Sequence, residues 1–312
     1  MKRIFGPVPS RRLGFSLGVD PVVPKTCTLD CVYCELGPTT DRTVCRRPYV
    51  RPDAILEELE QRLTEDLTLD FVTLSGSGEP TLNSEIGVIM DGIRGLTDVP
   101  IAVLTNGTLL ADPDVRSALL KADVVAPSLD AVSQGVFESV NRPDPSLKAG
   151  DVVGGLLTFA SQFTGQTWLE TLFVAGLNDD YDEVERIAEV VSEMKPERVH
   201  VNTVLRPPAE ANARPVSSER LKEIAGRLGP TAEVIAGPVS EGQRIASDDV
   251  TGLVLAMAAR RPVTSIDIAR SAGVSLAAAA KIVDELVEKK LLAVVRHDQR
   301  LYYRTCLERG CQ

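Results

Sequence analysis

The alternation of strand-like and helix-like segments between residues 70 and 206 most constrains the fold of this chain. Five runs rich in apolar residues are candidate strands: residues 70–75, 101–105, 123–128, 167–174 and 198–204. Longer helical patterns lie before and between them, at residues 52–65, 83–96, 112–120, 133–140, 148–163 and 181–194. Near-continuous apolar character is typical of strands buried in a parallel sheet. With a further strand at 16–19, the pattern predicts an α/β protein of about six strand–helix units, which can curl toward a barrel.

Three cysteines follow the candidate strand at 16–19 at short, fixed intervals. Three residues separate Cys27 from Cys31, and two separate Cys31 from Cys34. One short loop can therefore bring three thiolates to a single cluster, and thiolate sulfur selects soft, iron–sulfur-type centres. A [4Fe–4S] cube normally takes four Cys, so three would leave one iron open to a cofactor or substrate. The alternatives are three unrelated thiols or a zinc site, although no fourth Cys or His occurs in the next ten residues.

A glycine-rich turn, residues 75–80, follows the candidate strand at 70–75. It contains Gly76, Ser77, Gly78 and Glu79 in direct succession. Glycine lets the backbone approach a ligand closely, and the Glu79 carboxylate offers an acceptor for an ammonium group. The turn is therefore a candidate binding site, and an ordinary strand-to-helix turn is the alternative.

Polar residues also end the two strands that follow. Thr105 and Asn106 close one strand, and Ser128 and Asp130 close the other. Ligands bind at the carboxyl ends of parallel strands, so these residues are candidates for holding a cofactor. Turn residues that satisfy backbone groups are the alternative interpretation.

The cysteine spacing, the aromatic Tyr33 before the last Cys and the Gly-Glu-Pro sequence at 78–80 together resemble the radical S-adenosylmethionine (SAM) superfamily. The resemblance implies a partial (βα)6 parallel barrel and a [4Fe–4S] cluster whose open iron binds the amino and carboxylate groups of SAM. One electron from the cluster then cleaves SAM to methionine and a 5′-deoxyadenosyl radical. An electron donor such as flavodoxin or ferredoxin is implied as a partner.

The same resemblance assigns roles to the candidate residues. Cys27, Cys31 and Cys34 would hold the cluster, and the turn containing Gly76, Ser77, Gly78 and Glu79 would bind the SAM amino group. Ser77 stands where relatives usually have a glycine. Tyr33 would face the adenine. The methionine carboxylate and the ribose would meet the polar strand ends, Thr105, Asn106, Ser128 and Asp130.

The N-terminal segments 5–14, 17–20 and 24–27, with residues 77–82, resemble more closely the group related to wyosine (4-demethylwyosine) synthase, over roughly residues 1–210. Those synthases modify a guanosine of tRNA and hold pyruvate on a lysine as an imine. They also carry a second cluster on N-terminal cysteines, whereas this chain has no cysteine before Cys27. The substrate therefore stays open between RNA and a peptide or protein.

Lys25 lies two residues before Cys27. It is a candidate Schiff-base lysine, and the alternative is an electrostatic partner of SAM or substrate. Cys45, Cys306 and Cys311 remain outside the cysteine loop. They are either ligands of an auxiliary cluster or free thiols.

The pattern changes near residue 246. Helical stretches at 250–259, 264–271 and 275–289 precede two strands, 291–296 and 300–304. Three helices and a two-stranded wing predict a winged helix-turn-helix domain at 246–312, after a core domain at 1–245. No SAM motif lies in this second domain, so we expect reductive SAM cleavage to proceed without it.

Charge and composition limit the partners. The chain carries a net charge of −10. The expected recognition helix, 275–288, contains Lys281 but also Asp284, Glu285 and Glu288, so it is poorly suited to duplex DNA. The start of the chain lacks the apolar stretch of a signal peptide, and no apolar run is long enough to span a bilayer, so a cytoplasmic location without membrane contact is expected. The leading hypothesis is a radical SAM enzyme, and the alternative is an iron–sulfur-sensing regulator that binds DNA through the winged helix.

Overall fold

A computed structural model describes residues 2–10, 12–65, 67–235, 250–298 and 300–306. Eight strands form one open sheet in the order β1-β2-β5-β6-β7-β8-β9-β10. All neighbours are parallel except β1 and β2, which form an antiparallel edge. The strands are β1 (Ile4–Ser10), β2 (Gly14–Val19), β5 (Phe71–Leu74), β6 (Ile101–Thr105), β7 (Val124–Pro127), β8 (Gln166–Phe173), β9 (Arg198–Thr203) and β10 (Ala232–Val234).

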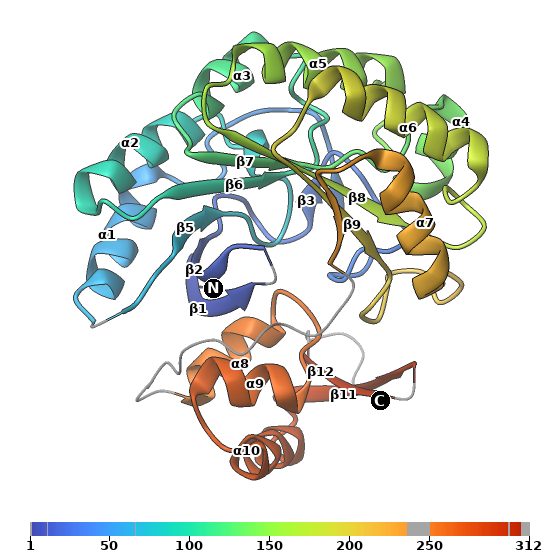
Figure 1. The fold of residues 1–312 in the computed structure, drawn as a ribbon. Coiled ribbons are helices and arrows are strands. Elements are labelled where there is room, and N and C mark those ends of the chain that lie inside the picture. The colour runs from blue at the N-terminus through green and yellow to red at the C-terminus, as the bar shows by residue number, and fades with distance from the viewer. Residues whose placement is uncertain (1, 11, 66, 236–249, 299, 307–312) are drawn as a thin grey trace.

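Six of the parallel strands, β2 and β5 to β9, are each followed by a helix, as the sequence alternation predicts. The helices are α1 (Pro52–Leu63), α2 (Ile86–Leu96), α3 (Pro113–Leu119), α4 (Gln134–Val140), α5 (Ala149–Gln162), α6 (Tyr181–Met194) and α7 (Ser218–Leu228), with a short 3-10 helix at Pro80–Leu82. They cover the outer face of the curved sheet (Figure 1). Local signals set their ends: Asp112, for example, caps α3 by accepting from Asp114 N, and Pro113 occupies the first turn.

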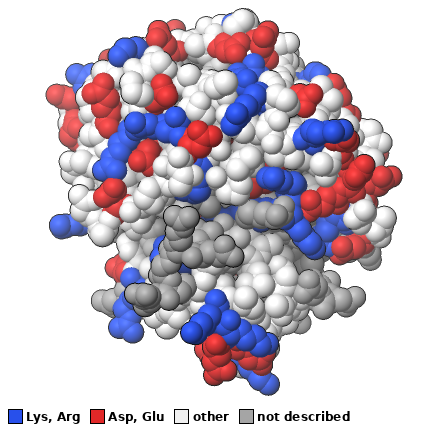
Figure 2. All heavy atoms as spheres, turned by 180° about the vertical axis from the view of Figure 1, so that it is seen from behind, with Lys and Arg blue, Asp and Glu red and all other residues white. Residues whose placement is uncertain are grey.

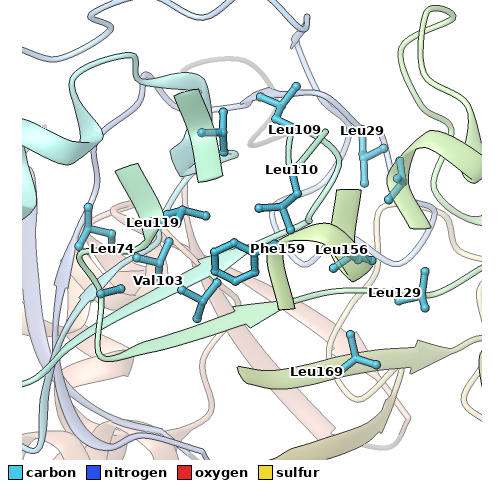
Figure 3. Packing of buried hydrophobic residues seen from close by; sticks show 14 of the residues in the cluster. Leu29, Leu74, Val103, Leu109, Leu110, Leu119, Leu129, Leu156, Phe159 and Leu169 are labelled. Carbon is cyan, nitrogen blue, oxygen red and sulfur yellow. The ribbon is translucent and has the colours of Figure 1, made fainter. Parts of the chain in front are cut away.

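The main core lies between the sheet and these helices. Phe159 of α5 is fully buried and points toward Val103 of β6, with Leu110 and Leu156 beside it (Figure 3). Ala102 precedes Val103 and belongs to a second cluster with Trp168. Because successive side chains of a strand point to opposite faces, the sheet buries apolar residues on both faces, which explains the continuous apolar runs in the sequence.

Residues 250–298 and 300–306 form a C-terminal module. It contains α8 (Val250–Ala258), α9 (Ser265–Ala272), α10 (Leu276–Glu288) and the hairpin of β11 (Leu292–His297) and β12 (Arg300–Thr305). Gly273 ends α9 in the left-handed conformation and allows the tight turn into α10. The module has its own apolar cluster. The expected domain boundary at 245/246 lies outside the described residues.

Strand β1 was not predicted from the sequence, and it lies where the module meets the core. Figure 1 shows the module beside the β1–β2 hairpin. Val8 of β1 packs against the module's apolar cluster, so the hairpin contacts both parts of the molecule. A small parallel pair, β3 (Thr26–Cys27) and β4 (Asp41–Arg42), was also not predicted. Among the described residues, no helix has the length and apolar character needed to cross a membrane.

Candidate functional site

The cysteine loop, residues 27–34, lies against the carboxyl ends of the parallel strands. The side-chain amide of Asn106, directly after β6, lies 3.5 Å from Cys27 Sγ and donates to it. Asn141, directly after α4, donates in the same way to Cys31 Sγ at 3.5 Å. Cys27, Cys31 and Cys34 are all half-buried. The fold therefore brings the three predicted ligands to one place and supplies amide donors to two of their sulfurs.

The environment of these thiols favours their neutral form. Burial, followed by the nearby Glu79 carboxylate, raises the pKa of Cys27 to about 12. Burial and then Asp130 raise the pKa of Cys31 well above its usual value. Burial also raises the pKa of Cys34, although the Lys25 ammonium opposes the rise. The cysteines repel one another electrostatically when charged, so positive charge from bound iron is what would stabilise three thiolates here.

The donor set fits a cluster better than a single ion. Within the described part of the chain, no three His, Cys, Asp or Glu side chains converge on a point that one metal ion could occupy. A mononuclear zinc site requires such convergence. A [4Fe–4S] cube does not, because each Cys binds a different iron.

Both glycines of the glycine-rich turn are required by close packing. A Cβ at Gly78 would lie 1.9 Å from the Thr26 carbonyl oxygen, and one at Gly76, where φ is +131°, would lie 2.5 Å from Asp20 Cγ. Glu79 N donates to the Thr26 oxygen at 3.0 Å. Gly78 therefore lets this turn lie directly against the strand that carries Cys27, and Gly76 lets it lie against Asp20 at the end of β2.

Ser77 has a contact that a glycine at this position could not make. Its hydroxyl donates to Asp20 Oδ2 at 2.6 Å, and its backbone N donates to Asp20 Oδ1 at 3.3 Å. Both residues are buried. The departure from the family pattern at Ser77 thus fastens the turn to the end of β2.

Glu79 is 2% exposed and is held by its neighbours. Its Oε1 accepts from the hydroxyls of Thr81 and Thr105, both at 2.6 Å. Its Oε2 accepts from Asn106 N at 2.7 Å. Burial raises the pKa of Glu79, and these hydrogen bonds oppose that rise. Thr105 and Asn106 thus orient Glu79, and Oε2 keeps capacity for a further donor.

Asp130, Tyr33 and Asn141 form a second polar group beside the loop. The Tyr33 hydroxyl donates to Asp130 Oδ2, which also accepts from Asn141 Nδ2 at 2.7 Å. Leu172 N donates to Asp130 Oδ1 at 2.8 Å, and burial raises the pKa of Asp130. These three residues line a small cavity together with Asn106 and Ser128. Asn141 was not predicted from the sequence, because it follows a helix and ends no strand.

Lys25 lies between the cysteine loop and the glycine-rich turn. Its backbone N donates to Ser77 O at 2.7 Å, and its Nζ donates to Gly37 O. Cys45 is exposed, and Cys306 follows β12 in the C-terminal module. Cys311 lies outside the described residues, so an auxiliary cluster stays a prediction.

Comparison with known proteins identifies the family. The family model "Radical SAM superfamily" matches residues 22–191. The chain is 38% identical over 205 residues to a UPF0026 protein of Synechocystis, covering 65% of this chain and 76% of the relative. It is 30% identical over 266 residues to a UPF0026 protein of Helicobacter pylori, covering 84% and 85%. It also matches a Brachyspira hyodysenteriae protein named "GTPase Obg" at 37% identity over 71% of this chain, but spans only 33% of that protein.

Solved structures share the fold. A radical SAM methyltransferase from Sphaerobacter thermophilus aligns with a TM-score of 0.53 at 20% identity, covering 70% of this chain and 65% of that one. The FeFe-hydrogenase maturase HydG from Carboxydothermus hydrogenoformans aligns with a TM-score of 0.50 at 14% identity, covering 80% and 67%. A [4Fe–4S] cluster and SAM are the cofactors that the matched family implies. Because the family model matches more than half of the chain, the chain belongs to the radical SAM superfamily of enzymes.

Proposed function

We propose that this enzyme cleaves SAM reductively and uses the resulting 5′-deoxyadenosyl radical to modify a substrate larger than SAM. One observation carries the proposal. The cysteine loop, the buried Glu79 carboxylate and the cavity beside Asp130 all lie at the carboxyl ends of the parallel strands, and Asn106 contacts all three. A cluster ligand set, an ammonium acceptor and a polar cavity are what SAM needs around it.

The residues then divide the work of binding. Cys27, Cys31 and Cys34 hold the cluster, which supplies one electron to SAM when bound. Glu79 Oε2 accepts from the SAM ammonium, and the Tyr33–Asp130 pair borders the remainder of the ligand. Lys25 is retained as an electrostatic partner of SAM or substrate, because its ammonium lies near Cys34. A flavodoxin or ferredoxin is the proposed electron donor.

The C-terminal module is proposed to be a winged helix that docks the substrate. The tight turn between α9 and α10 and the β11–β12 hairpin after them support this assignment. The N-terminal segments support kinship with the wyosine synthase group, although the UPF0026 relatives carry a name that specifies no substrate. RNA and a peptide or protein are the two proposed substrate classes.

The decisive experiment is anaerobic reconstitution with iron and sulfide, followed by reduction with dithionite in the presence of SAM. Mass spectrometry should detect 5′-deoxyadenosine in amounts that rise with time. The protein lacking all three loop cysteines is the control. Reconstituted protein with a full cluster that yields no 5′-deoxyadenosine would contradict the proposal.

An iron–sulfur-sensing DNA-binding regulator is the second candidate. A sensor needs the cluster but has no use for a buried ammonium acceptor such as Glu79. Figure 2 shows Lys/Arg and Asp/Glu interspersed over the visible face, with both signs at the end formed by α10. Phosphate contacts require a concentration of positive charge. Sequence-selective binding of duplex DNA by the full chain at physiological salt would favour the regulator.

A further inference from the structure

Arg260 of the C-terminal module reaches into the core domain. It follows α8, and its side chain is 5% exposed. One guanidinium nitrogen donates to Lys2 O at 2.6 Å and another to Ala256 O at 3.0 Å. The guanidinium carbon lies 4.0 Å from the centre of the Phe5 ring, and Nε lies 3.8 Å from Asp20 Oδ2. A cation from the module is therefore buried beside a carboxylate of the core domain.

Asp20 connects this arginine to the glycine-rich turn. Its carboxylate is 1% exposed, accepts from both the hydroxyl and the backbone N of Ser77, and lies directly against Gly76. Arg3 and Arg260 are the two cations whose charge acts on it. A buried carboxylate needs both hydrogen bonds and a cation to remain charged. Glu79, the proposed ammonium acceptor, follows Ser77 by two residues.

A second arginine makes a similar connection to the cysteine loop. Arg206, between β9 and α7, donates to Asp267 Oδ2 of the module at 3.0 Å and to Pro262 O at 2.6 Å. Its Nε lies 3.6 Å from Glu35 Oε2. Glu35 directly follows Cys34. The module is thus linked to the glycine-rich turn through Arg260 and Asp20, and to the residue that follows Cys34 through Arg206, whose side chain is 11% exposed.

We propose that the C-terminal module is a positioning element of the SAM site, and that Arg260 is a positioning residue that fixes the glycine-rich turn through Asp20 and Ser77. The inference rests on the proposed role of Glu79 in binding SAM. It differs from the sequence expectation that SAM cleavage proceeds without residues 246–312. The reason is geometric: Arg260, whose Nε lies 3.8 Å from Asp20 Oδ2, belongs to the module.

Loss of the arginine should loosen the turn. Without Arg260, Asp20 keeps its hydrogen bonds to Ser77 but loses a buried cationic partner, so its carboxylate is expected to become neutral or turn toward water. The hydrogen bonds that Ser77 donates to Asp20 then weaken, so the backbone from Ser77 to Glu79 is held less firmly against Thr26. Binding that depends on the position of Glu79 should weaken by roughly tenfold, the effect of one charged contact.

The test compares wild type with Arg260→Met in the full chain. SAM affinity is measured by calorimetry on anaerobically reconstituted protein. Hydrogen–deuterium exchange of the Ser77 and Glu79 amides is measured on cluster-free protein. We expect roughly tenfold weaker SAM binding, faster exchange at both amides and unchanged iron content per chain. Wild-type affinity and wild-type exchange in a folded Arg260→Met protein would overturn the inference.

Two further variants separate positioning from simple destabilisation. Asp20→Asn combined with Arg260→Met removes the uncompensated charge while keeping an acceptor for Ser77, so it should recover most of the lost SAM affinity. Leu286→Ala weakens the module's apolar cluster without touching either arginine link, and it should bind SAM as wild type does. A loss in Leu286→Ala equal to that in Arg260→Met, or no recovery in the double variant, would overturn the assignment to Arg260. Wild type that binds no SAM would instead contradict the proposed function.

Discussion

The candidate site at the carboxyl ends of the strands and the C-terminal module differ in the kind of side chain that each one buries. In the site, three carboxylates are buried almost completely, Asp20, Glu79 and Asp130. Each accepts two or more hydrogen bonds. In the described part of the module, the buried polar or charged residues are Arg260 and Ser271, and the rest of the buried set is apolar or tyrosine.

The difference affects the stability of each region. Burying a carboxylate costs free energy even when it is hydrogen-bonded, whereas apolar burial stabilises. The site keeps charges out of water at positions where a charged ligand can use them. The module folds around an ordinary apolar core and supplies charge to the site only at its boundary.

Removing the three loop cysteines, the proposed cluster ligands, should have the largest effect of any change in the site. Cys27→Ala, Cys31→Ala and Cys34→Ala combined should abolish the cluster absorbance and 5′-deoxyadenosine formation, because no thiolate remains in the loop. Iron analysis and mass spectrometry check this. The matched control is the exposed Cys45→Ala, which should keep both. Deoxyadenosine from the triple variant would show that the site lies elsewhere.

Glu79→Gln should have the next largest effect. It keeps the side-chain shape but removes the negative charge that is proposed to face the SAM ammonium, and such a contact contributes about 1.5–3 kcal/mol. SAM affinity should fall by about ten- to a hundredfold, while iron content stays at the wild-type level. Calorimetry checks this, with Glu57→Gln on the exposed face of α1 as the control. An unchanged SAM dissociation constant would remove Glu79 from the site.

Tyr33→Phe should have a smaller effect. It deletes the hydrogen bond to Asp130 but keeps the aromatic ring that is predicted to face the adenine. A loss of about 1 kcal/mol, or roughly fivefold in SAM affinity, is expected. Tyr33→Ala should lose more, because it also removes the ring. Equal losses in the two variants would show that the hydroxyl, and not the ring, is what SAM binding uses.

Leu286→Ala should separate the two regions most sharply, with the smallest effect on SAM. Truncating a buried leucine costs about 2–5 kcal/mol, so thermal unfolding of the module should begin at a lower temperature. SAM affinity measured well below that temperature should change by less than about twofold. A loss as large as that of Arg260→Met would show that the site depends on the module's internal packing and not specifically on Arg260.

Much of the fold and part of the site follow from local sequence patterns. The alternation of apolar runs and helical periodicities predicts the parallel strands to within a few residues, because burial on both faces leaves a visible mark on each strand. The turn at Gly273 and the final hairpin are likewise local. Strand β1 was not predicted in this way, because it carries two prolines and pairs antiparallel at the sheet edge.

The sequence by itself determined the chemistry of this protein, since three thiols at intervals of three and two residues and a nearby Gly-Glu-Pro turn are local features. Only the tertiary structure decided what holds that chemistry in place. Asn141 reaches Cys31 across 110 positions, and Arg260 reaches Lys2 across 258. Such contacts leave no periodic mark in the chain, because each is a single pair whose partners the fold brings together. The role of Ser77 shows the same limit: the sequence shows a missing glycine, and the structure shows a hydroxyl bound to Asp20.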